Sequence, residues 1–570
     1  MNSKIKKLVA YAAALITVFM TASGVYGATE ISQLDKAYWP WQERFNAALE
    51  AGDHAGIIAS GEEITALFLV GGDPAVKAAE WKAGGDLELN ILRTVTQSVA
   101  EAYEALGDFA GARAAYELTL PVAVAWQEAN APADTEFVKT IYQNKIAAYG
   151  ASMTLYAQIP GAGGDVSCHG AKHEPAAGII YGEVHAGDEA KRVNSAKTPS
   201  ASLVYVLYET EIISDFDWII RPLTQTRDIV EIAWNVLYEG DTLPAVTNGR
   251  AKIEAAADYL NGLGTPIWLR FGAEMNVWQK KADPAQFIAA FRFVSSIMKE
   301  RAPNVAMLWS PGATGHIETT YAQFYPGDEY VDWVGVSLYT VKYFQGNKNL
   351  DGTAQVLYMT GGFANPVKKL EGIVAQYGDR KPIMLSECGV ENYSVTNGED
   401  VTEWAKPQLR AVYQTIPMVY SQVKAILYFN TAVEGLDEAY RYTLYDNPAM
   451  ETLYAASVAN PYFLPAGTAS APVTYKKLVS GAGKAQLPQN SVALAIYAPF
   501  VQKDVTVTYM LDGQWIGSSP AAPYRQIFDF SGYADGEHLL TVTAAAGGVT
   551  LDSGEYSVNI AGGVCTVEKR

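Results

Sequence analysis

The sequence is short of cysteine, histidine and basic residues. Its 570 residues include three Cys and six His, and none of them has the spacing of a zinc site. The 42 Lys and Arg are outnumbered by 61 Asp and Glu, which gives a net charge of -19. A chain this acidic lacks the basic face that binds nucleic acid or an anionic membrane surface. We therefore expect neither of those partners, and no metal or other cofactor.

Hydrophobic and aromatic residues, by contrast, are abundant. Hydrophobic residues make up 49% of the chain and charged residues 18%, a balance that excludes wholesale disorder. Stability is expected to come from packed cores rather than from a disulfide framework, although a single bridge between Cys168 and Cys565 is considered. The 35 Tyr and 12 Trp suit sugar ligands, because rigid rings present an apolar face and a polar edge. Burial of these rings in large cores is the other explanation.

Residues 1–27 have the layout of a secretory signal peptide. Three lysines precede an apolar stretch at 8–19, and small residues stand before a cleavage site at Ala28. The apolar stretch is shorter than the roughly 20 residues of a membrane span. An uncleaved anchor is the alternative. We expect an exported protein, extracellular or associated with the cell wall, with no membrane span after the signal is removed.

Residues 28–158 are predicted to be helical, since alanine is dense, proline is sparse and apolar residues recur at intervals of three and four. Two similar stretches place a Gly-Asp pair between helical runs, at Gly52-Asp53 and Gly107-Asp108. Glycine can end one helix and aspartate can cap the next. The second stretch resembles a tetratricopeptide repeat, but the pairs are farther apart than the repeat length of about 34 residues. The region is either a docking surface for a protein partner or a helical spacer.

Residues 165–463 alternate short apolar runs with helical stretches, which is the pattern of a (β/α)8 barrel. A doubly wound open sheet is the competing fold, but no glycine-rich phosphate loop follows any of the runs. Two of the expected helices are 250–263 and 284–301. The eight candidate strands are, in chain order, AGIIYGEV, SLVYVLYE, VEIAWNVLY, TPIWLRFGAE, NVAMLWSPG, DWVGVSLY, KPIMLSECG and AILYFN.

Residues 473–570 change to the two-residue alternation that is typical of strands. Asp512-Gly513 between two alternating runs predicts a hairpin turn, and we expect a small antiparallel β-sandwich. From Val507 to Ala544 the layout resembles that of bacterial immunoglobulin-like modules. Such modules usually act as spacers or as contacts with the cell wall, and sugar binding is a less favoured alternative.

Two acidic residues directly follow apolar strands of the predicted barrel. Glu274 ends the fourth run and Glu387 ends the seventh. The reactive groups of such barrels lie at the carboxyl ends of the strands, and strands four and seven face each other across the mouth. A glycosidase needs one protonated carboxyl group for the leaving oxygen and one ionised carboxylate for the anomeric carbon. The pair therefore indicates glycoside hydrolysis, with Glu274 and Glu387 as candidate catalytic residues.

The two acids lie within longer motifs, LRFGAEMNVW around Glu274 and KPIMLSECG around Glu387. These motifs resemble the strand-four and strand-seven segments of glycoside hydrolase family 26. The run 325–333 and the strand after it are also similar, so the resemblance covers residues 175–462. It implies a retaining enzyme of clan A that acts on β-mannan or on a related β-glucan or xylan. It also implies Glu274 as the acid/base and Glu387 as the nucleophile.

The resemblance also suggests supporting residues. Tyr339 ends the sixth strand, where the family places a Tyr that hydrogen-bonds the nucleophile; a plain aromatic residue at the rim is the alternative. Arg270 is predicted to orient or tune the nucleophile, or else to pair with an internal acid, since a charge inside a strand needs a partner. Asn276 and Trp278 follow the acid/base, and Trp278 is the best candidate to stack on a sugar ring. Trp234, on the third strand, either stacks on sugar or fills the barrel.

One position departs from the family pattern. The family has His directly before the acid/base, whereas this chain has Ala273, whose side chain cannot hydrogen-bond. Loss of one transition-state hydrogen bond lowers a rate about 10²- to 10³-fold. Either another residue takes over this contact, or the substrate differs, or the barrel is a weak or inactive relative.

The sequence therefore predicts a secreted retaining endo-β-glycosidase that cleaves a β-linked polysaccharide or oligosaccharide. The multidomain chain would combine an α-helical N-terminal domain, a TIM barrel and a C-terminal antiparallel β-sandwich. A different family of the same clan would keep both acids but change the glycan. The alternative from another class is a glycan-binding or scaffolding protein on an inactive barrel, with protein or cell-wall contacts through the helical or sandwich domain.

Overall fold

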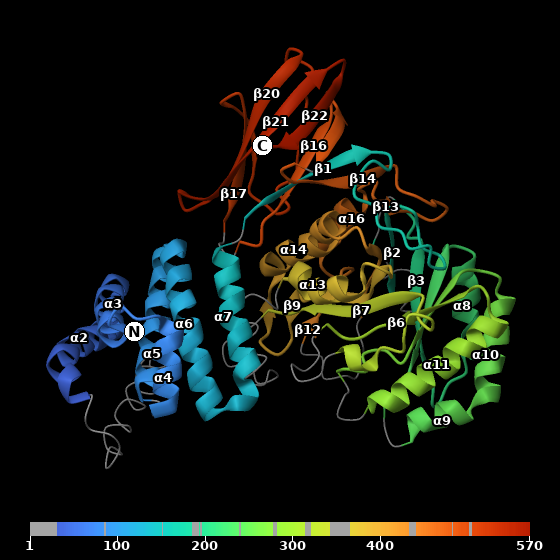
Figure 1. Cartoon of the computed structure of the whole chain (residues 1–570). Helices are drawn as coiled ribbons and strands as arrows, with labels where there is room; N and C mark the ends of the chain where they lie inside the picture. The colour runs from blue at the N-terminus through green and yellow to red at the C-terminus, as the bar shows by residue number, and fades with distance from the viewer. Residues whose placement is uncertain are drawn as a thin grey trace. The chain divides into compact units, whose positions relative to one another are not determined.

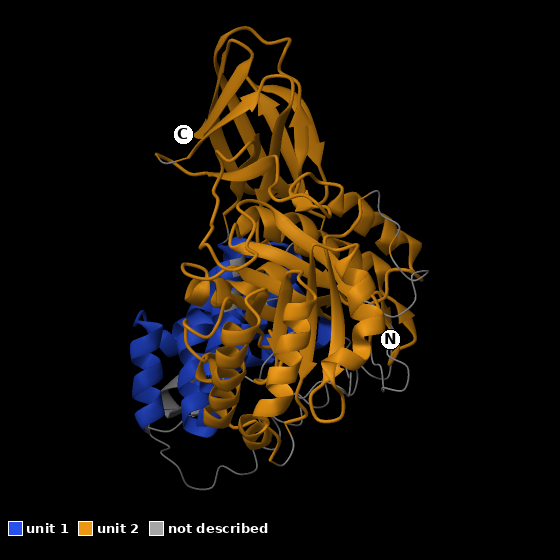
Figure 2. Ribbon diagram, turned by 90° about the vertical axis from the view of Figure 1, so that its right-hand side faces the viewer, with its two compact units in different colours: residues 1–151 blue, residues 152–570 orange. Residues whose placement is uncertain are grey.

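The computed structural model describes residues 31–570 except for eleven short segments and single residues. The exceptions are 85–86, 151, 185–192, 194–196, 239–240, 278–281, 314–320, 343–364, 432–439, 482 and 501–503. The expected signal peptide, 1–27, and the sugar-stacking candidate Trp278 lie outside the described residues. The chain divides into two compact units, residues 1–151 and 152–570 (Figure 2).

The first unit is helical where it is described, and its apolar side chains meet in a buried core that includes Ile64, Leu92 and Val122. Its helices are α2 (Ile31–Ala51), α3 (His54–Leu69), α4 (Pro74–Gly84), α5 (Leu87–Leu106), α6 (Phe109–Asn130) and α7 (Thr135–Tyr149) (Figure 1).

The two Gly-Asp pairs of this unit end and begin helices as predicted. Gly52 and Gly107 adopt left-handed φ values of 66° and 77°, which a glycine tolerates without strain. Asp53 and Asp108 then accept backbone N–H hydrogen bonds as caps of α3 and α6. The resemblance to a tetratricopeptide repeat stays a prediction.

The helical region ends earlier than its predicted limit at residue 158. Tyr149 ends α7, and the strand β1 (Thr154–Pro160) follows. β1 pairs antiparallel with β14 (Val473–Leu478) and β16 (Val492–Tyr497). The helical prediction is therefore wrong for 154–158, because the partners that hold this strand lie far along the chain and leave no local signal.

Eight parallel strands form a closed barrel in the second unit, which confirms the predicted fold of this region. Each strand pairs with the next in chain order, and the last closes the ring by pairing with the first. All eight apolar runs contain strands: β2 (Ile179–Val184), β3 (Ala201–Leu207), β4 (Ile229–Asn235), β5 (Ile267–Phe271), β6 (Val305–Trp309), β7 (Trp333–Thr340), β8 (Ile383–Val390) and β11 (Val423–Tyr428).

Short strands accompany the barrel. β13 (Phe463–Leu464) pairs with β2. β9 (Tyr393–Ser394) and β10 (Glu399–Asp400), which follow β8, form a small sheet with β12 (Tyr440–Arg441), which follows β11.

Helices connect the strands and lie around the barrel (Figure 1). α10 and α11 are the two helices that the sequence predicted, and Asp283 caps the second by accepting from the Gln286 N–H at 2.8 Å. The described α-helices of this part are α8 (Asp217–Thr224), α9 (Thr242–Asn248), α10 (Arg250–Gly262), α11 (Pro284–Arg301), α13 (Pro366–Tyr377), α14 (Thr402–Arg410), α15 (Ile416–Val419) and α16 (Pro448–Val458).

The segment before β2 covers the amino-terminal ends of several barrel strands. Trp333, at the start of β7, donates from Nε1 to the Lys172 carbonyl at 2.7 Å. Lys172 in turn donates from Nζ to the Val305 carbonyl at 2.9 Å. The carboxyl ends of the strands, where Glu274 and Glu387 lie, are at the opposite end of the barrel, which is where the reactive groups of such barrels are found.

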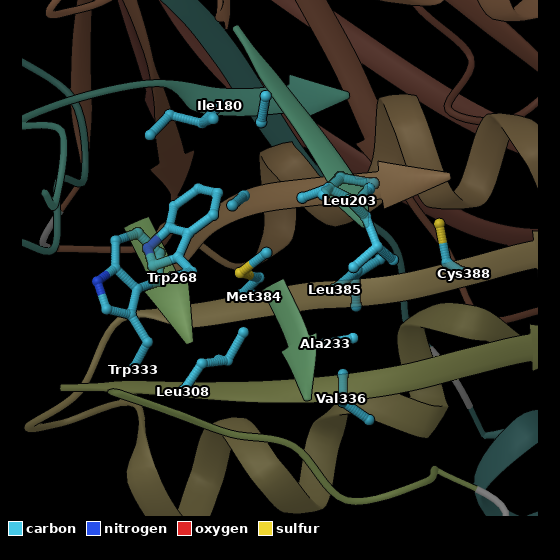
Figure 3. Close-up of a cluster of buried hydrophobic side chains, with 14 of the residues drawn as sticks. Ile180, Leu203, Ala233, Trp268, Leu308, Trp333, Val336, Met384, Leu385 and Cys388 are labelled. Atoms are coloured by element: carbon cyan, nitrogen blue, oxygen red, sulfur yellow. The ribbon is translucent and has the colours of Figure 1, made fainter. Parts of the chain in front are cut away.

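The barrel core is apolar and aromatic. Figure 3 shows Trp268 and Trp333 together, with Leu308 and Met384 nearby. The two indole rings meet edge to face with their centroids 5.1 Å apart, an arrangement that aromatic pairs favour. The interior of the barrel is therefore packed mainly with apolar and aromatic side chains.

The three cysteines are free, so the bridge considered between Cys168 and Cys565 does not form. Cys388, beside Glu387 in the sequence, is buried in the core (Figure 3). Burial raises the pKa of its thiol well above the ordinary value. An un-ionised buried thiol is unreactive, which agrees with a structural role for Cys388.

Two antiparallel sheets form the C-terminal part of the second unit, and buried residues of both, such as Leu155 and Val507, belong to one core. One sheet has the order β14-β1-β16-β19 and the other the order β15-β22-β21-β20-β17-β18. The remaining strands are β15 (Lys484–Pro488), β17 (Thr506–Leu511), β18 (Gln514–Ser519), β19 (Gln526–Phe528), β20 (Gly536–Ala546), β21 (Val549–Ala561) and β22 (Val564–Lys569). The predicted hairpin at Asp512-Gly513 is confirmed, since it joins the paired strands β17 and β18. The immunoglobulin-like character stays a prediction.

In the described part of the chain, no single helix has both the length and the apolar character needed to cross a membrane. By those two criteria alone, the bent pair His54–Leu69 and Pro74–Ala83 would pass when taken together.

Candidate active site

Glu387 lies near the carboxyl end of β8, and three side chains donate hydrogen bonds to it. Arg270 Nη1 and the Tyr205 hydroxyl each approach Oε2 at 2.7 Å. The Tyr339 hydroxyl donates to Oε1. The donors come from β5, β3 and β7, so strands from different parts of the ring converge on one carboxylate. This confirms that Tyr339 contacts Glu387, as the resemblance implied.

These donors keep Glu387 ionised. Burial is the largest influence and raises the pKa of Glu387, whereas the charge of Arg270, the next largest, lowers it. Hydrogen bonds from Tyr339, Arg270 and Tyr205 act in the same direction as the charge, and together they lower the pKa of Glu387. Glu387 is therefore a carboxylate at neutral pH, held in one orientation.

Arg270 is the cation at the centre of the site and is only 1% exposed. Besides Glu387, it donates from Nη2 to Ser337 Oγ at 2.7 Å. Its Nη1 also lies 3.6 Å from Glu231 Oε1. Both contacts that the sequence suggested for Arg270 are therefore present, one with the nucleophile candidate and one with an internal acid.

Glu274 follows β5 in a tight turn and has a left-handed φ of 57°. Its N–H donates to the Ser310 carbonyl at 2.9 Å, which ties the turn to the end of β6. Burial raises the pKa of Glu274, and the negative charge of Glu387 raises it further. Arg270 and a hydrogen bond from Ser337 act in the opposite direction without cancelling the rise. Glu274 and Glu387 thus have pKa values displaced in opposite directions, which is how two carboxyl groups take the roles of acid and base.

Neighbouring residues fix the turn that carries Glu274. Gly272 has a φ of 59°, and the Tyr238 hydroxyl donates to the Ala273 carbonyl at 3.2 Å. Asn276 is fully buried and makes two hydrogen bonds of 2.8 Å with the backbone of Gly312. Asn276 therefore supports the turn rather than reaching a substrate.

The two candidate tryptophans that the structure describes are buried. Trp234 is 0% exposed and packs against Tyr208 and Phe271, with ring centroids 5.1 and 6.0 Å away. A ring with no exposed surface cannot stack on a sugar, so the core-filling alternative holds for Trp234 and the stacking alternative is wrong. Trp309 is likewise buried among tyrosines. Trp278 lies outside the described residues.

Sequence reasoning missed three residues of the site: Tyr205, Ser337 and Glu231. Tyr205 donates directly to Glu387, and Ser337 connects Arg270 with Glu274. All three stand inside apolar strands, where the only available signal was a polar residue in a run otherwise suited to burial. No group of three or more His, Cys, Asp or Glu that could hold a metal ion occurs among the described residues.

Residues 226–399 match glycosyl hydrolase family 26. The family 26 stretch contains β4 to β8 and therefore both acids, Arg270 and Tyr339. None of the curated proteins compared with the chain matches it.

Solved structures of family 26 mannanases are similar to the chain at low identity. A modular endo-β-1,4-mannanase from Cellulomonas fimi is 18% identical with a TM-score of 0.38, and the match covers 67% of this chain and 94% of that one. A family 26 β-mannanase from Bacteroides ovatus is 15% identical with a TM-score of 0.36, covering 51% and 91%. A β-glucuronidase from Bacteroides uniformis is 12% identical with a TM-score of 0.35, covering 67% and 46%. At TM-scores this low the likenesses carry no inference about activity.

Proposed function

We propose that this protein is a retaining glycoside hydrolase that cleaves internal bonds of a β-linked polysaccharide. β-Mannan is the first candidate substrate, and related β-glucans and xylans follow. The family 26 match of residues 226–399 supports the hydrolase class. The observation that carries the proposal is the opposite displacement of two pKa values: that of Glu387 is lowered and that of Glu274 is raised.

In the first half of the reaction Glu387 attacks the anomeric carbon and forms a glycosyl ester. Glu274, whose pKa is raised by burial and by the charge of Glu387, donates its proton to the glycosidic oxygen as that bond breaks. The hydrogen bonds from Tyr205 and Tyr339 hold the Glu387 carboxylate in place before the attack. Orientation of this kind removes part of the entropy cost of bringing reactants together.

In the second half Glu274 is a carboxylate and takes a proton from water. The water attacks the anomeric carbon, the ester bond breaks, and Glu387 leaves as a carboxylate again. Arg270 at 2.7 Å stabilises the charge that returns to Glu387 Oε2. Two displacements at the same carbon retain the anomeric configuration.

Ala273 bears on which glycan is cleaved. The Ala273 carbonyl accepts from Tyr238, and its methyl side chain offers no hydrogen bond to a sugar hydroxyl. A pocket that lacks a donor discriminates less against sugars that lack the matching hydroxyl. The substrate panel therefore has to extend beyond mannan.

The test is release of reducing ends by the protein lacking residues 1–27. Mannan, glucomannan, mixed-linkage glucan, xylan and laminarin form the panel. Glu387→Ala is expected to lower the rate at least about 10³-fold. Glu371→Ala is the matched control, because Glu371 is an exposed carboxyl group on α13 that lies 3.9 Å from Lys368.

Two further readouts test the finer parts of the proposal. A fall in viscosity that precedes most of the reducing-end release indicates cleavage at internal bonds of the polysaccharide. Release of short products without that fall contradicts internal cleavage. Proton NMR of the first product gives the anomer. The β-anomer supports retention, and the α-anomer would overturn the assignment of Glu387 as a nucleophile.

Ala273 also favours a second candidate, a barrel that binds glycan without cleaving it. In that case the helical unit and the C-terminal sheets carry contacts with a protein partner or the cell wall. The same panel separates the two. Binding to one glycan without release of reducing ends by the wild-type chain favours the scaffold.

The proposal includes export, with residues 1–27 as the signal peptide. Expression of the full chain in a bacterial host is expected to yield a product in the extracytoplasmic fraction whose first residue is Ala28. A product that keeps residues 1–27 and stays with the membrane would instead favour an uncleaved anchor.

A further inference from the structure

Glu231 is a buried acid that the proposed reaction does not use. It lies on β4, and its register partners are Leu203 on β3 and Trp268 on β5. It is 0% exposed. Its Oε1 lies 3.6 Å from Arg270 Nη1, the same nitrogen that lies 2.7 Å from Glu387 Oε2, so both acids lie next to one guanidinium group.

Neither oxygen of Glu231 has a hydrogen-bond partner among the described residues. Glu387, by contrast, receives three donors. A carboxylate buried without donors is costly, and such a group takes up a proton instead. The two acids next to Arg270 therefore differ: Glu387 has the donors that stabilise an ionised carboxylate, and Glu231 lacks them.

Among the described residues, few charged or titratable groups face Glu231. Arg270 reaches it from β5, Glu387 acts on it from β8, and Tyr205 faces the same cluster from β3. Burial raises the pKa of Glu231 to about 8; Glu387 adds to the rise and Arg270 opposes it. The pKa of Tyr205 is raised well above 10 by burial, so Tyr205 stays neutral over the same range.

We infer that Glu231 is a positioning residue that stays protonated while Glu387 is ionised, and so leaves the charge of Arg270 to Glu387. The inference rests on the proposed role of Glu387 as nucleophile. One cation and one carboxylate then form a balanced pair at the base of the site. Ionisation of Glu231 adds a second carboxylate to the same arginine, draws the guanidinium away from Glu387 and weakens the hold on the nucleophile.

The experiment isolates the attack by Glu387 from the proton transfer by Glu274. An aryl β-glycoside with a highly acidic phenol needs no acid to leave, so Glu274→Gln still forms the glycosyl ester but hydrolyses it slowly. The sugar of this substrate is the one that the polysaccharide panel identifies. The pre-steady-state burst of phenolate then reports attack by Glu387 alone, and it is measured from pH 6 to 10.

In the Glu274→Gln chain the burst rate is expected to fall about tenfold or more as Glu231 ionises above pH 8. Adding Glu231→Gln is expected to remove that fall, because the amide cannot ionise. The same alkaline fall in both chains would overturn the inference. So would a large loss of rate at pH 6 in a Glu231→Gln chain that remains folded, because that result means an ionised Glu231 is needed.

An infrared difference spectrum reads the proton without any substrate. The spectrum of the Glu274→Gln variant is measured at pH 6, and that of the Glu274→Gln, Glu231→Gln double variant is subtracted from it. The difference is expected to show the carbonyl band of a protonated carboxylic acid. The band should disappear by pH 10, and its absence at pH 6 would overturn the inference. Glu231→Leu replaces Glu231→Gln in both experiments if the buried amide prevents folding. A chain with this band but no burst at any pH contradicts the proposed function and not the protonation of Glu231.

Discussion

Hydrogen-bond donors, rather than residue type, distinguish the two acids at the barrel mouth. Glu387 accepts hydrogen bonds from Tyr205, Tyr339 and Arg270, and its pKa is lowered although it is buried. Glu274 has burial and the charge of Glu387 acting on it, and its pKa is raised. Single donors should therefore have separate and measurable effects on activity.

Removal of the Tyr205 hydroxyl is expected to slow the attack by Glu387. Tyr205→Phe takes away the 2.7 Å hydrogen bond to Oε2 and should lower kcat/KM about 10- to 100-fold. Because that hydrogen bond lowers the pKa of Glu387, the acidic limb of the pH profile should move to higher pH. Tyr259→Phe is the control, since Tyr259 bonds Asp217 on the surface. A lower rate with an unmoved acidic limb would contradict this account of Tyr205.

Residue roles could be predicted where a strand ends and not where it runs through the core. Glu274, Glu387 and Tyr339 follow apolar strands, and that position alone pointed to the mouth of the barrel. Glu231 and Trp234 both lie within β4, three residues apart, and three steps along a strand place side chains on opposite faces. Strands buried on both faces show no alternation of polar and apolar residues, so the sequence could not tell which of the two faced the site.

Among the elements, the turn after β5 matters most, because it places Glu274, the proposed acid/base. Gly272 and Glu274 both have left-handed φ values, 59° and 57°. A non-glycine residue in this conformation is strained and persists only where its surroundings hold it. Two sets of hydrogen bonds stabilise the turn: one from the Tyr238 hydroxyl to the Ala273 carbonyl, and one between Asn276 and the Gly312 backbone.

Gly272→Ala is expected to disturb this turn. The added Cβ would stand 2.9 Å from the Tyr238 hydroxyl and 3.0 Å from Phe287, at a φ that alanine tolerates poorly. Unfolding free energy should fall by about 1–3 kcal/mol, and hydrolysis should fall more than the lost stability explains, as Glu274 shifts. Gly262→Ala, with no atom within 4 Å of the added Cβ, is the control and should be neutral. Equal activity in the two variants would count against a positioning role for the turn.

The barrel strands and the strand β1 show why some elements could be predicted and others not. The eight barrel strands are apolar runs set off by helices, and each pairs with a neighbour in the chain order, so local pattern and register agree. β1 sits between β14 and β16, whose residues lie hundreds of positions later. Its sequence follows a helical region without a break in composition, and only the distant partners define it as a strand.

At the scale of the whole molecule, the site residues all lie in the second unit, 152–570. A chain that begins at residue 152 should therefore keep kcat/KM within about twofold. A chain that begins at residue 165 lacks β1, with its buried Leu155 and Ile159, and should aggregate or melt at lower temperature. Equal melting temperatures of the two chains would contradict the assignment of β1 to the C-terminal sheets.

The pH dependence of stability also belongs to this scale. The folded-state pKa of Glu231, about 8, lies above the ordinary value of 4.5, so the folded chain keeps a proton that the unfolded chain loses. The stability that this proton provides is complete below about pH 4.5 and disappears as the pH rises to about 8, at about 1.4 kcal/mol per pH unit. Urea unfolding should show the wild-type chain losing stability relative to Glu231→Gln over this range. Parallel curves would mean that Glu231 is already ionised in the folded chain.

The central claim is that Glu387 forms a covalent bond with the sugar while Glu274 handles the proton. Glu274→Gln, treated with the activated aryl glycoside, should accumulate the glycosyl-enzyme because hydrolysis of the ester needs Glu274. Mass spectrometry is expected to show one added glycosyl unit, located on Glu387 within Ile383–Val390. An adduct on another residue, or hydrolysis by the wild-type chain with no adduct at any time, would contradict the account.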